Sequence, residues 1–199
     1  MIHQTAAAQT RDAAASNTRQ LALHSGIAVA ATAFVALCAH ISIPLGFTPV
    51  PITLQPFAVL LLGLLLAPQL SFAALCLYLV EGASGLPVFS PHGPGGIAQL
   101  FGPTGGYLMA APFAAAIAGL IYRDGKKKFL YAIAGAAVGD LILLAIGALW
   151  LGILANTSFS VLMRESVIPF LASDAVKVIA AAACAQTYAS FTRRSSQLQ

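Results

Sequence analysis

Charged side chains are scarce in this sequence, and their scarcity excludes most classes of soluble protein. Only 8% of the 199 residues are Asp, Glu, Lys or Arg, against roughly 25% in an ordinary soluble domain. Residues 20–122 contain a single charged side chain, Glu81. A water-facing surface cannot be built from such a stretch, so most of the chain must be solvated by lipid.

Signatures of catalysis and energy coupling are also absent. The sequence contains no G-x-x-x-x-G-K-[ST] motif, so by itself it cannot couple ATP hydrolysis to another process. It also contains no G-x-S-x-G or H-E-x-x-H motif. Cys38, Cys76 and Cys184 form no C-x-x-C pair. We therefore expect three small buried thiols, no metal site, no cofactor and no enzyme activity.

Long apolar runs are what the sequence has in abundance. A helix needs about 20 mostly apolar residues to cross roughly 30 Å of hydrocarbon. Four runs are long enough: Leu21–Ile43, Thr104–Tyr122, Phe129–Leu151 and Ile168–Ser190. The run Phe57–Val80 is ambiguous. It is either one span or two short helices, near Leu54–Ala67 and Leu70–Leu86, that turn at Pro68-Gln69.

The basic residues favour the two short helices. With six helices in total, eight of the ten Lys and Arg residues lie on one side of the membrane, only Arg164 lies on the other, and Lys177 lies within a span. Cytoplasmic segments are enriched in Lys and Arg. The sequence thus predicts an all-α membrane protein with six transmembrane helices and both termini cytoplasmic. The short, separated basic clusters argue against a nucleic-acid surface.

The membrane domain is expected to comprise residues 21–192. Residues 1–20 are rich in Ala, Gln, Thr and Ser and lack the apolar core of a signal peptide, which predicts a disordered cytoplasmic tail. Residues 193–199 are expected to form a second cytoplasmic tail.

Two of the predicted outer loops are unusual. Residues 46–56 are dense in Pro, and residues 81–103 are rich in Gly and Pro, yet both segments are largely apolar. Such segments cannot be regular helices, and at membrane depth irregular backbone must be buried against protein. They are either ordinary connectors or a lid over an outward-facing pocket.

Three ionisable side chains fall within the predicted spans: Asp140, Asp174 and Lys177. Each costs about 2.5–3.5 kcal/mol at a helix centre, so each should have a partner or a task. Asp174 and Lys177 lie one turn apart on one helix face, and Asp140 and Lys177 could meet near mid-membrane. These side chains form either a buried ion pair or triad that satisfies itself, or a ligand site. We favour the ligand site because a facing acid and base suit a polar small molecule.

Small residues recur every four positions along the first span, in two series: Ala22, Gly26 and Ala30, and Ala28, Thr32 and Ala36. Such spacing lets another helix approach closely. The series serve either internal packing or the docking of a separate membrane protein.

Several segments closely resemble motifs of the BioY family, in the right order over about residues 21–190. They are IPLGFTPVPITLQ at 43–55, EGASGLPVF at 81–89, Gly95-Gly96, FGPTGGY at 101–107 and PFLASDAVK at 169–177. The resemblance implies a biotin-binding substrate subunit of an energy-coupling-factor (ECF) transporter in the bacterial plasma membrane. Such a subunit works with a transmembrane coupling subunit and ABC-type ATPases supplied by other chains.

The resemblance also implies site residues. Asp174 and Lys177 match the last motif directly, and the other candidates for binding biotin are Thr53, Gln55 and Tyr107, with Gln99 as a further one. If the small residues of the first span serve docking, Ala22, Gly26 and Ala30 are the residues that would contact the coupling subunit. Asp140 falls on no family motif.

Two other functions stay open on the sequence alone. One is a self-sufficient small-molecule permease, either facilitative or driven by proton exchange between Asp140 and Lys177. The other is an intramembrane enzyme that uses the same acid and base, although no nucleophile or metal set is recognisable.

Overall fold

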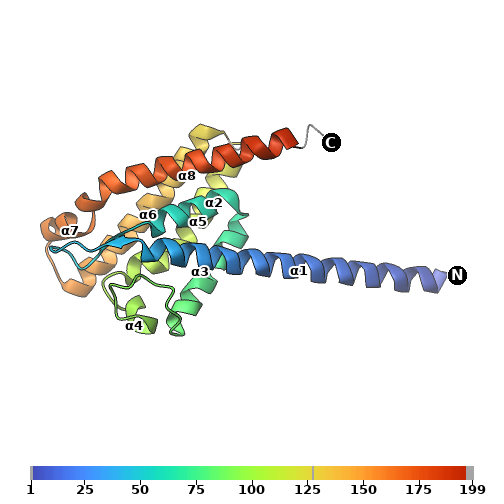
Figure 1. The fold of residues 1–199 in the computed structure, drawn as a ribbon, viewed down its shortest axis with the longest axis horizontal. Coiled ribbons are helices and arrows are strands. Elements are labelled where there is room, and N and C mark those ends of the chain that lie inside the picture. Colours follow the sequence, from blue (N-terminus) through green and yellow to red (C-terminus); the bar gives the residue numbers. More distant parts are fainter. Residues whose placement is uncertain (1, 127, 196–199) are drawn as a thin grey trace.

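In the computed structural model the chain is almost wholly helical (Figure 1). The structure describes residues 2–126 and 128–195, with side chains for residues 18–126, 128–192 and 195. Lys127 of the basic loop and residues 196–199 of the predicted C-terminal tail lie outside this part. The elements are α1 (Ile2–His40), β1 (Ser42–Ile43), β2 (Ile52–Thr53), α2 (Gln55–Leu65), α3 (Pro68–Ala83), α4 (Gly96–Leu100), α5 (Gly105–Asp124), α6 (Phe129–Ala155), α7 (Phe159–Ser166) and α8 (Ile168–Ser195).

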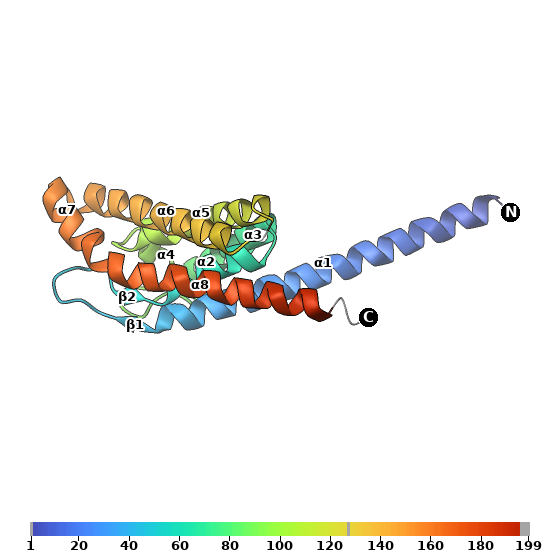
Figure 2. The same ribbon diagram turned by 90° about the horizontal axis from the view of Figure 1, so that it is seen from above.

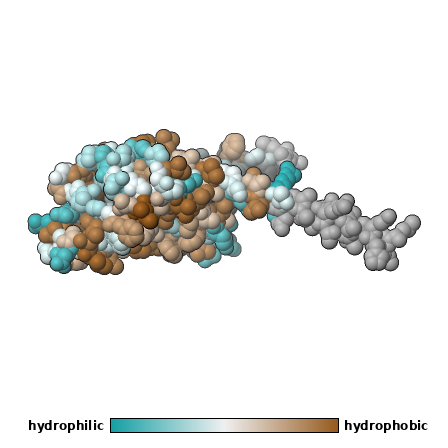
Figure 3. Space-filling view, turned by 90° about the horizontal axis from the view of Figure 1, so that it is seen from below, coloured by the Kyte–Doolittle hydropathy of each residue, from teal (hydrophilic) through white to brown (hydrophobic). Residues whose placement is uncertain are grey.

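Four segments are long and apolar enough to cross a membrane, and they coincide with the four predicted runs. They are Thr18–His40, Gly105–Asp124, Phe129–Ala155 and Phe159–Thr192. Large apolar side chains on these helices point outward, among them Leu149 and Val176, as lipid contact requires. Figure 3 shows hydrophobic side chains across the middle of one face of the bundle, with hydrophilic ones at both of its ends and along its upper edge.

The ambiguous run Phe57–Val80 is two helices, as the charge distribution favoured. α2 ends at Leu65 and α3 begins at Pro68, so the break lies at residues 66–67, just before the predicted Pro68-Gln69 turn. Proline suits the first turn of a helix because it has no backbone N–H to leave unbonded. The two helices have 11 and 16 residues, fewer than an ordinary span, and the six-span topology stays a prediction.

α5 lies at the centre of the bundle and packs against α2, α3 and α6. Small residues permit the close approach. A Cβ added at Gly139 of α6 would lie 2.9 Å from the backbone oxygen of Ala114 in α5. Buried alanines of α5, such as Ala115 and Ala118, belong to the two main core clusters.

The structure corrects several expectations about the ends and loops. α1 begins at Ile2 and so includes residues 2–20, in keeping with the high helix propensity of their many alanines, while the predicted disorder of this tail stays a prediction. α8 continues to Ser195, past the predicted boundary at residue 192. The predicted loops contain helices α4 and α7, and the all-α expectation overlooks an antiparallel pair, Ser42 with Thr53 and Ile43 with Ile52, which closes the Pro-rich loop.

The helices alternate in direction, so the start of α1 and the end of α8 lie at the same end of the molecule (Figures 1 and 2). The strand pair, α4 and α7 lie at the opposite end, where α2, α5 and α8 begin. Residues 46–56 and 81–103 therefore meet at one end of the bundle, although a helical hairpin separates them in sequence.

Candidate functional site

A cavity opens at the end of the bundle where these loops meet. The empty space that it encloses, the open mouth included, is about 680 Å³. Its walls come from the loop before α2, from α2, α4, α5, α6 and α8, and from the loop at Ser90. Apolar residues such as Val59, Leu108 and Leu143 make up much of the lining.

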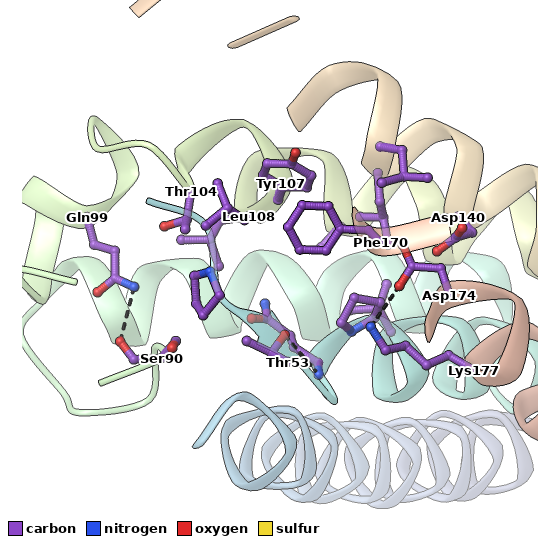
Figure 4. Close-up of a pocket in the computed structure, with 18 residues that line it drawn as sticks. Thr53, Ser90, Gln99, Thr104, Tyr107, Leu108, Asp140, Phe170, Asp174 and Lys177 are labelled. Atoms are coloured by element: carbon purple, nitrogen blue, oxygen red, sulfur yellow. Dashed lines mark hydrogen bonds and ion pairs between the residues drawn. The ribbon is translucent and has the colours of Figure 1, made fainter. Parts of the chain in front are cut away.

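All of the predicted ligand-binding residues line this one cavity. They come from five separate elements: Thr53, Gln55, Gln99, Tyr107, Asp174 and Lys177. Figure 4 shows Gln99 at one end of the cavity and the Asp174–Lys177 pair at the other. The structure thus brings the residues together, while their role in binding stays a prediction.

Asp174 and Lys177 form a buried ion pair. The Lys177 Nζ atom lies 2.7 Å from Asp174 Oδ1. Lys177 is 7% exposed and Asp174 is 4% exposed. The Ser173 hydroxyl donates to the Phe170 carbonyl at 2.9 Å and to Asp174 Oδ1 at 3.3 Å. An ammonium group has three donors and a carboxylate has two acceptor oxygens, so this pair retains capacity for a ligand.

Asp140 lies in the same region of the cavity, on α6 (Figure 4). It is 7% exposed, and its Oδ1 atom is buried with no hydrogen-bond partner among the described residues. The predicted proximity of Asp140 and Lys177 is confirmed to the extent that both line one cavity. The ion pair of Lys177, however, is with Asp174.

The hydroxyl of Tyr107 is hydrogen-bonded to the protein backbone. It donates to the Ser166 carbonyl at 2.9 Å, which ties the start of α5 to the junction of α7 and α8. The Tyr107 and Phe170 ring centroids lie 6.5 Å apart. Gly147 of α6 leaves room for the Tyr107 ring, which any Cβ at that position would overlap. Tyr107 therefore offers a fixed aromatic surface to the cavity.

The side-chain amide of Gln99 holds the glycine-rich loop in place. Its Nε2 atom donates to the Ser90 carbonyl and its Oε1 atom accepts from the Gly95 N–H, each at 3.2 Å. Gln99 is only 2% exposed. A Cβ at Gly93 would lie 2.6 Å from the Gln99 Cδ atom, so a larger residue there would have to displace the Gln99 side chain. This geometry makes Gln99 a clamp on the loop as well as part of the cavity wall.

Sequence reasoning missed several cavity residues, notably Ser90, Thr104 and Phe170. Phe170 had a usable signal, because it lies four residues before Asp174 and so on the same helix face. Thr104 lies within the FGPTGGY segment and Ser90 directly follows EGASGLPVF, but hydroxyl residues are common in connecting loops and only the folded loops place these two at the cavity.

The two small-residue series of α1 differ in exposure. Ala28 and Ala36 pack against the core, and Thr32 is buried and donates to Glu81 of α3 at 3.2 Å, so this series serves internal packing. Ala22, Gly26 and Ala30 are exposed. A Cβ at Gly26 would have no atom within 4 Å.

Among the described residues, no group of three or more His, Cys, Asp or Glu side chains could hold a metal ion. The three cysteines are free, but only Cys38 is buried as expected, while Cys76 is partly buried and Cys184 is exposed. An outward-facing helix position in lipid is compatible with a thiol, which explains the difference.

Comparisons with known proteins agree with this architecture. The biotin transporter BioY of Thermotoga maritima is 36% identical over 155 residues, covering 76% of this chain and 86% of that protein. The biotin transporter BioY of Rhodobacter capsulatus is 34% identical over 176 residues, covering 83% and 92%. The crystal structure of the S-component for biotin from an ECF-type ABC transporter superposes with a TM-score of 0.78 at 26% identity, covering 86% of this chain and 93% of that chain.

The family comparison extends over nearly the whole sequence. The model of the BioY family matches residues 8–194, a range that includes every residue of the cavity. Members of this family are transporters rather than enzymes. The chain belongs to the BioY family.

Proposed function

We propose that this chain takes up biotin as the substrate-capture subunit of an ECF-type transporter. Its biotin-transporting relatives and its similarity to a biotin S-component support biotin as the ligand. The observation that carries the proposal is that the motif residues of both outer loops and of α8 line one cavity with the Asp174–Lys177 pair.

The chemistry of biotin suits this cavity. Biotin combines a cyclic urea, which has N–H donors and a carbonyl acceptor, with an apolar sulfur ring and a carboxylate on a flexible chain. Lys177 can donate to a carboxylate or carbonyl oxygen, and Asp174 can accept N–H donors. Apolar residues of α2, α5 and α6 can cover the ring system.

In the proposed topology six segments cross the membrane, the cavity faces outward and both termini are cytoplasmic. The start of α1 and the end of α8 lie at one end, as an even number of crossings requires. Residues 123–128, which contain four basic residues, connect α5 to α6 at that end. The loops 46–56 and 82–103 then close over biotin from outside.

Release to the cytoplasm requires other chains in this proposal, because the sequence has no ATP-binding motif. A transmembrane coupling subunit would dock on the exposed series Ala22, Gly26 and Ala30, where small side chains allow close helix contact. Its ABC-type ATPases would supply the energy that moves the subunit.

The capture step is tested by titrating the purified, detergent-solubilised chain with biotin in a calorimeter. Lipoic acid is the matched control ligand, because it has a carboxylate chain and a sulfur ring but no cyclic urea. We expect saturable binding of biotin and none of lipoic acid. Equal binding of both, or of neither, would contradict the proposal.

A second candidate is a permease that works alone, and the unpartnered carboxyl oxygen of Asp140 is the observation that favours it. Uptake of labelled biotin is measured in a host without coupling subunits, with and without a co-expressed coupling module. Uptake only with the module supports the ECF proposal. Uptake by the chain alone that a protonophore abolishes supports the permease.

A further inference from the structure

Asp140 places a carboxyl group in the wall of the cavity, and one oxygen of that group makes no hydrogen bond within the described part of the protein. The side chain lines the cavity and is 7% exposed, and Oδ1 has no partner among the described residues. Buried polar groups in native proteins are nearly always hydrogen-bonded, so an orphan one requires an explanation. A donor from a bound ligand that reaches this oxygen would satisfy it.

The neighbouring charges do not provide that partner. Lys177 lies 2.7 Å from Asp174 Oδ1, and its further polar contact is with Ser173 at 3.5 Å. In Figure 4 the Asp140 carboxyl group lies on the Asp174 side of this ion pair. The cavity end thus holds one cation and two carboxyl groups, and the cation is already matched by one of them.

A purely structural role accounts poorly for this arrangement. Burying an acidic residue at the centre of a spanning helix costs free energy. A carboxyl oxygen without a partner forms no hydrogen bond that could offset this cost. A donor that enters the cavity with the ligand would satisfy it.

We infer that Asp140 accepts an N–H hydrogen bond from the ligand and is a specificity-determining residue for a cyclic urea. This inference rests on the proposed function, since biotin supplies the urea. Asp174 then holds the ammonium group of Lys177 in place through their ion pair. Its remaining acceptor capacity can take a second N–H donor of the ligand. Ligands without the N–H group are rejected, because they leave a buried carboxyl group unpaired.

The test compares ligand ratios between variants. Affinities are measured for wild type, Asp140→Ala and Asp140→Asn with biotin, with its two mono-N-methylated urea derivatives and with biotin methyl ester. We expect wild type to prefer biotin over at least one N-methyl derivative by about tenfold to a hundredfold, the usual cost of leaving a buried acceptor without its donor. Asp140→Ala should bind biotin more weakly by a similar factor and lose that preference.

Two controls separate recognition from folding. Asp124→Ala removes an exposed carboxylate from the end of α5 and should keep every wild-type ratio. The ratio of biotin to its methyl ester should be unchanged in Asp140→Ala, because the ester alters the other end of the ligand. The ligand-free melting temperature of Asp140→Ala should equal or exceed that of wild type, since an unsatisfied buried group is removed.

The outcomes are distinguishable from failure of the proposed function. If wild type binds biotin and Asp140→Ala keeps its affinity and its preference against both N-methyl derivatives, the inference is wrong and the proposed function stands. A uniform loss of affinity for all ligands with a lower melting temperature also overturns it. Asp140→Asn, which keeps the side-chain shape and one carbonyl oxygen, should fall between wild type and Asp140→Ala. If wild type binds no biotin, the proposed function itself fails.

Discussion

The ammonium group of Lys177 lies 2.7 Å from the carboxylate of Asp174, one helical turn earlier on α8, and both side chains are almost completely buried. A buried ion pair adds little net stability compared with well-packed apolar residues, yet removing one partner is costly. The position of this pair in the wall of the cavity supports the proposed role in ligand binding.

Lys177→Ala should reduce biotin affinity by at least tenfold, because the donor to a biotin oxygen is lost. It should also destabilise the ligand-free protein by about 3–5 kcal/mol, since Asp174 is left buried without its cation. Calorimetric titration and thermal unfolding measure the two effects. Lys128→Ala, which removes an exposed lysine, is the matched control and should change neither.

The double variant Asp174→Leu with Lys177→Leu separates the two effects. Replacing both charges by apolar side chains should restore stability to near that of wild type or above it, while biotin binding stays lost. Recovery of biotin affinity in the double variant would remove the ion pair from the proposed site.

Gly147→Ala should weaken biotin binding without altering any polar group. The new methyl group overlaps the Tyr107 ring, which must rotate or shift. The hydrogen bond from the Tyr107 hydroxyl to the Ser166 carbonyl is then strained. We expect an affinity loss of about tenfold, measured by titration. Gly26→Ala, at a position with open space around it, is the control. Unchanged affinity in Gly147→Ala would mean that the position of Tyr107 does not matter for binding.

Gln99→Ala should increase the rate of biotin release more than it changes the rate of binding. Both hydrogen bonds from the Gln99 amide go to the loop, at Ser90 and Gly95, so the variant loosens a segment that we propose closes over the ligand. Stopped-flow or filter-binding kinetics should show a several-fold faster dissociation, as expected when loop order is lost. A change in the association rate of biotin alone, with an unchanged dissociation rate, would contradict the proposal that the loop closes over the ligand.

Gly26→Leu should abolish uptake that depends on the coupling subunit while leaving biotin binding intact. Position 26 has free space within the chain, so a leucine side chain disturbs only a helix packed against it from outside. Uptake in cells and binding to purified protein are measured in parallel. Ala36→Leu is the contrast, because Ala36 packs against the core and its enlargement should lower stability. Normal uptake by Gly26→Leu would place the docking surface elsewhere.

Much of the architecture follows from local features of the sequence. The lack of charge over residues 20–122, broken only by Glu81, requires a lipid environment, and the four long apolar runs coincide with helices. Pro68 marks the break between α2 and α3 to within a residue or two. The i, i+3 spacing places Asp174 and Lys177 on one face. Solvation of side chains, helix periodicity and the backbone restrictions of proline act over a few residues. The sequence alone is therefore sufficient to predict these features.

The site's finer properties depend on contacts between distant segments. Only the packing of α1 against α3 decides that the series containing Thr32 is internal and the series containing Gly26 is exposed. Only the folded loops show that the Tyr107 hydroxyl and the Gln99 amide are bonded to backbone groups. The rotation of α6 about its axis places Asp140 in the cavity wall. Helix rotation and loop closure are fixed by packing across the whole bundle, and no local pattern in the sequence encodes them.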